Sequence, residues 1–561
     1  MRAAARLAWS SLVLALPSAA NAVPSPDTVA VVFNAAVPGS VALAMRYAEA
    51  RAIPSRQRCG LDLPTSDTIT LAEYRDRVAT PLRRCLTDGG VDARIEALVL
   101  VRGVPLRVAI PATGGAQNAS LAAVLMVDGA RYADGAAFLD RALPGVTRSC
   151  GTTACLAARW VNPYDDGEFS AGWTRTLDGV QWNLRLVTML HGRSDEEAGM
   201  LVQSALDGDA AGTVPGAWML MNGADPARAA LDHTYDAVAE RLRDLGRDVR
   251  RVPFDTALTG QTLAAFVTGT ASLGTTIEGN RLSPGAVVDN LTSFGAVPQN
   301  FTTTGEAQVS VARWIARGAA GAHGTVDEPL NNCFPRRDFL TDYAEGSTLA
   351  EAYLRNMPFV YWRNVVLGDP MAAPWARRPR VTVDGVREGE TLTAPRRITL
   401  HGAAPDGATV ATTALYLDGV ARAHVDGDTI SWCLEGDGAR ELLAVSQLAQ
   451  DSGPGLHTPK GWTRLRVTLR NAVGGCDADA GNDAATAVDA SDDRGDAPAV
   501  FDAGDDAPRP SDAGAPRTEV NGCACTTTRP SRSRGAFWAA LALLALGVRR
   551  GRRAATTATG S

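Results

Sequence analysis

The chain contains almost no lysine: Lys460 is the one lysine among its 561 residues, and its other strongly basic residues are arginines. Its formal net charge is −6, and no stripe of basic and aromatic residues occurs, which argues against nucleic-acid binding. No P-loop and no G-x-G-x-x-G motif follows a strand-like run, so the usual signatures of nucleotide binding are missing. The cysteines and histidines lack zinc-ligand spacing, and the aspartates lack the spacing of a calcium loop. We therefore expect no nucleic-acid partner, no metal and no cofactor.

Residues 1–22 have the pattern of a secretory signal peptide. Arg2 and Arg6 form a basic start, residues 7–16 are mostly apolar, and Ala-Asn-Ala at 20–22 is a small-x-small cleavage site. A buried N-terminal helix is the weaker alternative, because the charge, the apolar segment and the cleavage site all agree. We expect the protein to be exported through the inner membrane.

The other end of the chain carries a short apolar segment. Residues 536–548 form an apolar run of thirteen residues, whereas a stable membrane span needs about 20. Four arginines follow at 549–553, and such a cluster holds its side of an apolar segment in the cytoplasm. With Cys523 and Cys525 ahead of the run, this order resembles the C-terminal sorting signal of myxobacterial surface proteins, the MYXO-CTERM type.

That resemblance implies that a sorting protease cuts near Cys523 or Cys525 and that the cysteine is tied to surface anchoring. The partner at this end would be the sorting machinery of the envelope, and the short helix would lie in the membrane before processing. The expected destination is the cell surface or outer membrane, or the medium after release. A plain tail anchor is the alternative reading.

Nine cysteines agree with export, because cysteines can pair outside the cytoplasm. Setting aside the two in the tail leaves seven, so at least one of them is unpaired or pairs between chains. Cys150 and Cys155 are the easiest local pair, and Cys433 and Cys476 could close a second domain.

Composition divides the chain into five parts. After the signal peptide, residues 23–376 are mixed and globular, and residues 377–475 are rich in β-branched residues and turns. Residues 476–520 are rich in aspartate, alanine and proline and have almost no large apolar side chains, so they should form a disordered spacer. Residues 521–561 are the sorting segment.

Residues 23–376 alternate strand-like and helix-like patterns. Continuous apolar runs at 29–33, 97–101 and 217–221 are typical of strands buried on both faces. Capping pairs such as Thr70 with Glu73 mark helix starts between them. This rhythm predicts an α/β domain with a mainly parallel sheet flanked by helices.

Residues 377–475 read as short strands with Asp-Gly turns at Asp384, Asp418 and Asp426. Regular short strands separated by such turns predict an all-β sandwich of immunoglobulin-like style. Nothing in this part looks catalytic.

Several segments of the first domain are distinctive together, among them "AVVDNLTSFGA", "RGAAGAHGT" and "VVLGDP". They resemble an uncharacterised family of exported bacterial proteins found where sorting-enzyme systems operate. No activity is established for that family. A more distant similarity is to the caspase-like fold of gingipain-type cysteine peptidases, in which one late strand ends at the catalytic histidine and the next at the catalytic cysteine.

The catalytic pair of those peptidases is not retained here. The segment "FVTGTASLG" offers Thr270 at the histidine position, and "NLTSFGA" offers Ser293 at the cysteine position. Thiolate attack requires the cysteine, and no imidazole stands where the proton would be accepted. The resemblance therefore implies a non-catalytic relative.

A serine hydrolase is the competing hypothesis. Ser293 would be the nucleophile, His323 the base, and Asp327 or Glu328 the group that orients the histidine. The alternative without catalysis is that Ser293 lies in a turn and that its hydroxyl is hydrogen-bonded within that turn. The remaining histidines, His191 among them, are scattered and are expected at surface or cap positions.

The sorting hypothesis predicts that Cys523→Ala combined with Cys525→Ala abolishes surface display. Without a cysteine, the sorting enzyme has no anchoring site. Display is measured by protease shaving of intact cells followed by immunodetection, with Cys333→Ala as the control that retains all tail cysteines. Unchanged display of the double variant would refute the sorting assignment.

Overall fold

The computed structural model describes residues 23–110, 117–139, 162, 174–177, 179–302, 305–329, 331–405, 407–449, 459–476 and 486–487. The signal peptide, Cys150, Cys155, Cys523, Cys525 and nearly all of the expected spacer lie outside these residues. Within them, no helix combines the length and the apolar character that crossing a membrane requires.

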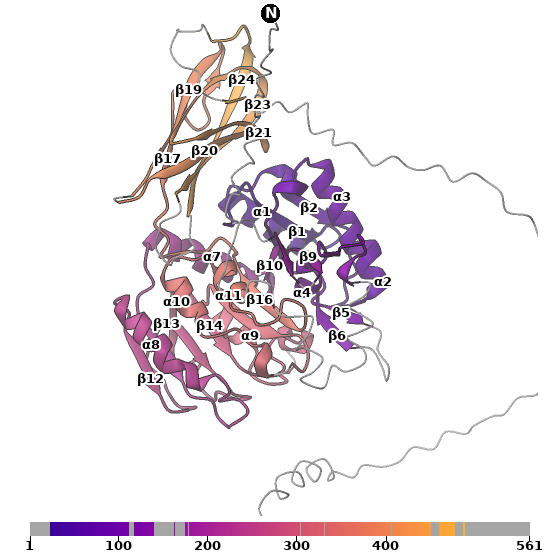
Figure 1. The fold of residues 1–561 in the computed structure, drawn as a ribbon, viewed down its shortest axis with the longest axis vertical. Helices are drawn as coiled ribbons and strands as arrows, with labels where there is room; N and C mark the ends of the chain where they lie inside the picture. The colour runs from indigo at the N-terminus through magenta and orange to yellow at the C-terminus, as the bar shows by residue number, and fades with distance from the viewer. Residues whose placement is uncertain are drawn as a thin grey trace, which may run out of the picture. The chain divides into compact units, whose positions relative to one another are not determined.

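One large sheet dominates the first domain and contains ten strands (Figure 1). In sheet order they are β12 (Val249–Val252), β11 (Ala217–Met221), β13 (Thr262–Thr268), β14 (Arg281–Asn290), β15 (Gly321–Thr325), β16 (Asn364–Gly368), β10 (Leu186–Leu190), β4 (Ala97–Val101), β1 (Val29–Asn34) and β2 (Arg58–Leu61). Pairing is parallel from β12 to β15 and from β10 to β2, and β16 runs antiparallel to β15. The predicted α/β class with a mainly parallel sheet is confirmed.

Every residue of the central strands β1, β4, β10, β11, β15 and β16 is buried, as the apolar runs predict. The covering helices are α1 (Pro38–Ala50), α3 (Thr80–Asp88), α4 (Leu121–Met126), α7 (Asp195–Ala211), α8 (Tyr235–Asp244), α9 (Val311–Ala316), α10 (Phe339–Ala344) and α11 (Leu349–Arg355). Neighbouring helices form two runs, α1–α7–α9 and α8–α10–α11.

Local signals fix several helix starts. Thr70 accepts from the Glu73 amide while the Glu73 carboxylate accepts from the Thr70 amide, which is the predicted capping box. A π-helical turn over Tyr74–Ala79 precedes α3, whose second residue is Pro81. The proline has no amide to donate, so the regular helical ladder is interrupted at this point.

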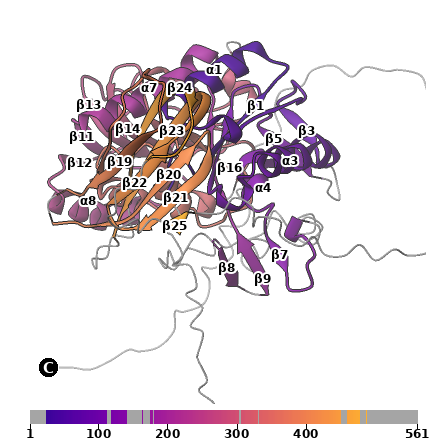
Figure 2. The same ribbon diagram turned by 90° about the horizontal axis from the view of Figure 1, so that it is seen from above.

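Two small sheets flank the large one. One contains β3 (Thr68–Thr70), β5 (Arg107–Ile110) and β6 (Gln117–Ser120), and the other contains β7 (Arg131–Tyr132), β9 (Val180–Asn183) and β8 (Thr174–Leu177). The strands of the second small sheet lie side by side in Figure 2.

A buried ionic cluster, which we call the lower brace, lies where α1 and α7 meet the end of β16. Asp369 follows β16 and is fully buried, and Arg51 at the end of α1 pairs with it. The same guanidinium lies 2.7 Å from the Asp209 carboxylate of α7. The Tyr47 hydroxyl and the Met371 amide donate to Asp369 over 2.7 and 2.9 Å. These contacts compensate the buried charges and tie α1 to the end of β16.

The second domain is a sandwich of two mainly antiparallel sheets, as predicted. One sheet contains β17 (Arg380–Asp384), β19 (Arg396–Ala403) and β22 (Thr429–Leu434). The other contains β18 (Thr391–Leu392), β24 (Lys460–Ala472), β23 (Gly436–Leu448), β20 (Val410–Leu417), β21 (Val420–Asp426) and β25 (Thr486–Ala487). Apolar side chains of both sheets form one core, Ile398 and Leu400 from the first with Leu415 and Leu442 from the second. The Asp418-Gly419 turn has positive φ at both residues, which a two-residue hairpin turn between β20 and β21 requires.

Strand β25 is a difference from the expectation of a disordered spacer. Thr486 and Ala487 pair with His424 and Ala423 of β21. The edge of this sheet offers unpaired backbone groups, and even a polar segment can add to them.

Two disulfides lie in the described residues. Cys433 joins Cys476, which links β22 to the end of the second domain. Cys59 joins Cys85, which links β2 to α3. The second pair was not anticipated from the sequence, because its partners are separated by 26 residues and belong to different elements.

The one lysine of the chain lies buried where β24 meets the first domain. The Lys460 ammonium is 4.0 Å from Glu96, while Asp27 accepts a 2.8 Å hydrogen bond from the Tyr416 hydroxyl of β20. Burial alone would lower the pKa of Lys460, but Glu96, Asp27 and Glu351 outweigh it and raise that pKa. Burial also raises the pKa of Glu96 to about 7.

We expect Glu96→Gln to flatten the pH dependence of unfolding between about pH 4.5 and 7. The pKa of Glu96 is raised from 4.5 to about 7, so the folded chain keeps a proton that the unfolded chain has released. The contribution of protonated Glu96 to the free energy of unfolding is therefore complete below about pH 4.5. It is lost as the pH rises through 7, by on the order of 1–3 kcal/mol. Urea unfolding at pH 4.5, 6 and 8 measures this, with exposed Glu240→Gln as the control. If the free energy of unfolding changes with pH equally in the wild type and in Glu96→Gln, this prediction is wrong.

Candidate functional site

Segments that follow strands of the large sheet contact one another at the kind of sheet edge where α/β proteins usually bind ligands. Arg107 of β5 donates to the Val326 carbonyl beyond β15 over 3.2 Å, and Asn118 of β6 donates to Asp327 over 2.9 Å. The His191 ring, just past β10, lies 4.4 Å from the Phe301 ring. All the predicted catalytic residues lie at or near this edge.

A buried polar cluster, which we call the upper brace, lies inside the ends of β14 and β15. Asp289 and His323 are directly opposite each other in the parallel ladder, and neither side chain has any solvent exposure. His323 Nδ1 is 2.7 Å from Asp289 Oδ1, and Nε2 is 3.1 Å from Asn364 Oδ1 of β16. Both ring nitrogens therefore face oxygen atoms, and neither presents a lone pair to a serine hydroxyl.

Arg337 completes the upper brace from the segment before α10. Its guanidinium pairs with the second oxygen of Asp289 and donates to the Thr268 carbonyl at the end of β13 over 3.3 Å. Burial alone would raise the pKa of Asp289, but Arg337 and His323 outweigh burial and hold that pKa below its ordinary value. The charged side chains are thus compensated, and four strands are cross-linked through them.

Ser293 lies in a turn just beyond the carboxyl end of β14. Its hydroxyl donates to Glu328 over 2.7 Å, its amide donates to Gln308 over 3.0 Å, and its carbonyl accepts from Thr325 over 2.8 Å. Ser293 is partly exposed, while Glu328 is exposed. Ser293 therefore behaves as a turn residue whose hydroxyl, amide and carbonyl are all hydrogen-bonded.

The structure does not assemble the predicted triad of Ser293, His323 and Asp327. Asp327 accepts from Asn118 and from the Glu328 amide, not from His323. The strand register is the reason: His323 is opposite Asp289, four residues before Ser293, and is enclosed inside the sheet.

Thr270, which was expected in place of a catalytic histidine, is also enclosed. Its amide donates to Asn290 Oδ1 over 2.9 Å, and its carbonyl accepts from Asn290 Nδ2 over 3.0 Å. Its hydroxyl closes a turn onto the Ser272 carbonyl over 2.9 Å. Thr270 therefore offers no base and no nucleophile to a substrate.

His191 corrects a further expectation, because it is buried and not at the surface. Burial, with Arg102 nearby, lowers the pKa of His191 to about 3, so the ring is neutral at ordinary pH. It packs against Phe301 as a core residue.

Sequence reasoning missed Arg337 and Asn364. Arg337 belongs to an "RRD" triplet in which nothing marks one arginine as buried, and Asn364 precedes an apolar strand. The one available clue was Asp289, a carboxylate inside an otherwise apolar run, because such a group requires a cationic partner.

Comparisons with known proteins give little further information. No protein-family model matches the chain, and no curated protein matches it significantly. Among solved structures, the chain is similar to fibronectin(III)-like modules of Clostridium thermocellum CbhA, with 18% identity over 17% of this chain and 99% of that chain, and a TM-score of 0.14. It is also similar to an endo-beta-1,4-mannanase from Thermotoga petrophila, with 9% identity over 48% of this chain and 50% of that chain, and a TM-score of 0.13. With such low scores, neither likeness indicates what this chain binds or does.

We expect Asp289→Asn to destabilise the protein by about 3–5 kcal/mol, because it leaves the Arg337 charge buried without its carboxylate. Urea unfolding followed by circular dichroism measures the change. The matched control is Asp236→Asn, which removes an 86% exposed partner of Arg251 and should cost less than about 1 kcal/mol. Equal effects of the two substitutions would contradict a stabilising role for the upper brace.

Proposed function

We propose that this chain is an exported, surface-displayed binding or scaffold protein without catalytic activity, built on a degenerate caspase-like domain followed by an immunoglobulin-like one. The observation that carries the proposal is the commitment of His323 to Asp289 and Asn364 inside the sheet. A hydrolase of the serine type needs a nucleophile, a base and an orienting group in mutual contact. Ser293 instead contacts Glu328.

Export is supported by the signal-peptide pattern and by the two disulfides, which persist in oxidising surroundings. Display at the surface is supported by the order of cysteines, apolar run and arginines at the C-terminus. The proposed partner for that end is the sorting machinery of the envelope, and the aspartate-rich segment would space the folded domains from it.

A serine hydrolase or peptidase that uses Ser293 is the second candidate. The observation in its favour is that the Ser293 hydroxyl is partly exposed and hydrogen-bonded to a carboxylate. A carboxylate alone is a weak base toward a serine hydroxyl, because its pKa lies far below that of the alcohol. We therefore favour the non-catalytic proposal.

We predict that the purified protein is not labelled by a serine-reactive fluorophosphonate probe. The carboxylate of Glu328, which accepts from the Ser293 hydroxyl, is too weak a base to activate it, and no described imidazole contacts that hydroxyl. In-gel fluorescence measures labelling, with a known serine hydrolase as the positive control and Ser293→Ala as the matched variant. Labelling that disappears in Ser293→Ala and in Glu328→Gln would establish the hydrolase instead.

A further inference from the structure

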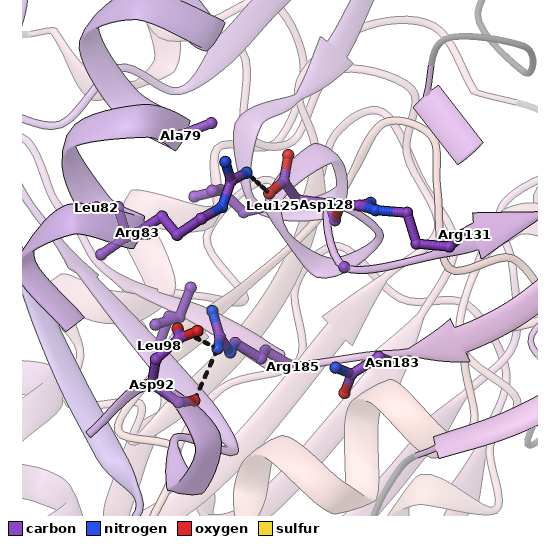
Figure 3. Close-up of a pocket in the computed structure, with 11 residues that line it drawn as sticks. Ala79, Leu82, Arg83, Asp92, Leu98, Leu125, Asp128, Arg131, Asn183 and Arg185 are labelled. Carbon is purple, nitrogen blue, oxygen red and sulfur yellow. Dashed lines mark hydrogen bonds and ion pairs between the residues drawn. The ribbon is translucent and has the colours of Figure 1, made fainter. Parts of the chain in front are cut away.

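A second feature lies away from the strand ends that carry Ser293. A cavity of about 200 Å³ lies between α3, the turn after α4 and the start of β10 (Figure 3). Its apolar walls include Leu82 of α3, Leu98 of β4 and Leu125 of α4. Its polar walls are arginine, aspartate and asparagine side chains, so apolar and charged groups line the same cavity.

Three arginines from three separate elements line this cavity, which we call the arginine pocket. Arg83 belongs to α3, Arg131 begins β7, and Arg185 lies between β9 and β10. Figure 3 shows the three guanidinium groups around the same opening. Sequence separation hides this grouping, since 102 positions divide the first arginine from the third.

The two carboxylates of the pocket are already engaged. Asp128 accepts from the Tyr74 hydroxyl over 2.9 Å, and its other oxygen lies 3.2 Å from Arg83. Asp92 lies 2.7 Å from Arg185. Each aspartate therefore has one arginine as its counterion.

Arg131 is the third cation, and no carboxylate in the described part of the chain pairs with it. Its Nη1 donates to the backbone carbonyls of Asp128 and Ala130 over 2.6 and 2.9 Å. These two bonds fix the direction of the side chain, while Nε and Nη2 have no acceptor among the described residues. The pocket thus holds three positive and two negative side chains and carries a net charge of about +1 by this count.

The turn that supplies Arg131 is packed closely enough to keep the pocket in shape. A Cβ atom at Gly129 would lie 2.6 Å from the Asn183 carbonyl oxygen, so only glycine lets the two segments approach. Arg185 is fixed on the other side by hydrogen bonds to the carbonyls of Ile95 and Asp92 over 3.1 and 3.0 Å. The guanidinium groups of Arg131 and Arg185 are therefore positioned before any ligand arrives, which reduces the entropic cost of binding.

We propose that the arginine pocket binds a small organic or inorganic oxyanion, a ligand with a carboxylate or phosphate group and on the order of ten non-hydrogen atoms or fewer. A cavity of about 150 Å³ is enough for benzene, so the size suits such a ligand. Guanidinium groups match carboxylate and phosphate oxygens through paired, charge-assisted hydrogen bonds. This proposal does not depend on whether Ser293 reacts.

Isothermal titration calorimetry of the purified protein tests the proposal with inorganic phosphate and with succinate, each against sodium chloride at equal ionic strength. We expect saturable binding of at least one of the two oxyanions and none of chloride. The ligand that binds more tightly, phosphate or succinate, shows whether the pocket prefers a phosphate or a carboxylate group. If neither phosphate nor succinate binds, or if chloride gives the same heat, the proposal is wrong.

Two variants locate the binding. Arg83→Gln removes a half-exposed guanidinium and should weaken binding about tenfold, since it deletes one charge-assisted contact. Arg131→Gln, which removes the third cation, should weaken it at least as much. The matched control is Arg84→Gln, an exposed neighbour on the same helix that does not line the pocket and should change affinity less than twofold. Equal loss in Arg84→Gln, or full binding in both pocket variants, would overturn the assignment.

Discussion

The Asp289 carboxylate, buried inside the ten-stranded sheet, is the constraint on which the first domain depends. A carboxylate without solvent must be compensated by cations and hydrogen bonds, or it destabilises the fold by several kcal/mol. Arg337 and His323 supply that compensation, and Asn364 fixes the far side of the histidine ring. The imidazole that a hydrolase would need is therefore used to stabilise the sheet. Among the described residues, this packing withholds the His323 imidazole from Ser293.

The two braces act at different places in the sheet. The upper brace cross-links the ends of strands β13 to β16, and the lower brace ties α1 and α7 to the end of β16 through Arg51 and Asp369. Strand β16 contributes Asn364 to the upper brace and leads into Asp369 of the lower brace, and it is fully buried between β15 and β10. The turns that carry Ser293 and Thr270 are small and polar, and the hydroxyl groups of both residues are hydrogen-bonded locally.

Much of the fold could be predicted from the sequence, because apolar runs of five residues identify buried strands and Asp-Gly pairs identify hairpin turns. The positions of polar side chains could not be predicted in the same way. Ser293 lies close to the end of β14, but the sequence could not show that His323 contacts Asp289 and Asn364 instead of Ser293. Partners such as Arg337 come from distant segments whose approach is set by tertiary packing. The arginine pocket, drawn from three elements, was hidden for the same reason.

The most direct test of the central claim is the chemical accessibility of His323. Treatment of the folded protein with diethylpyrocarbonate, followed by peptide mass spectrometry, reports which imidazoles can be reached from solvent. The upper brace predicts that exposed His233 and His401 are modified while His323 is not, because its ring is enclosed and both nitrogens face oxygen atoms. Modification of His323 in the folded protein at a rate close to that of His401 would contradict the account.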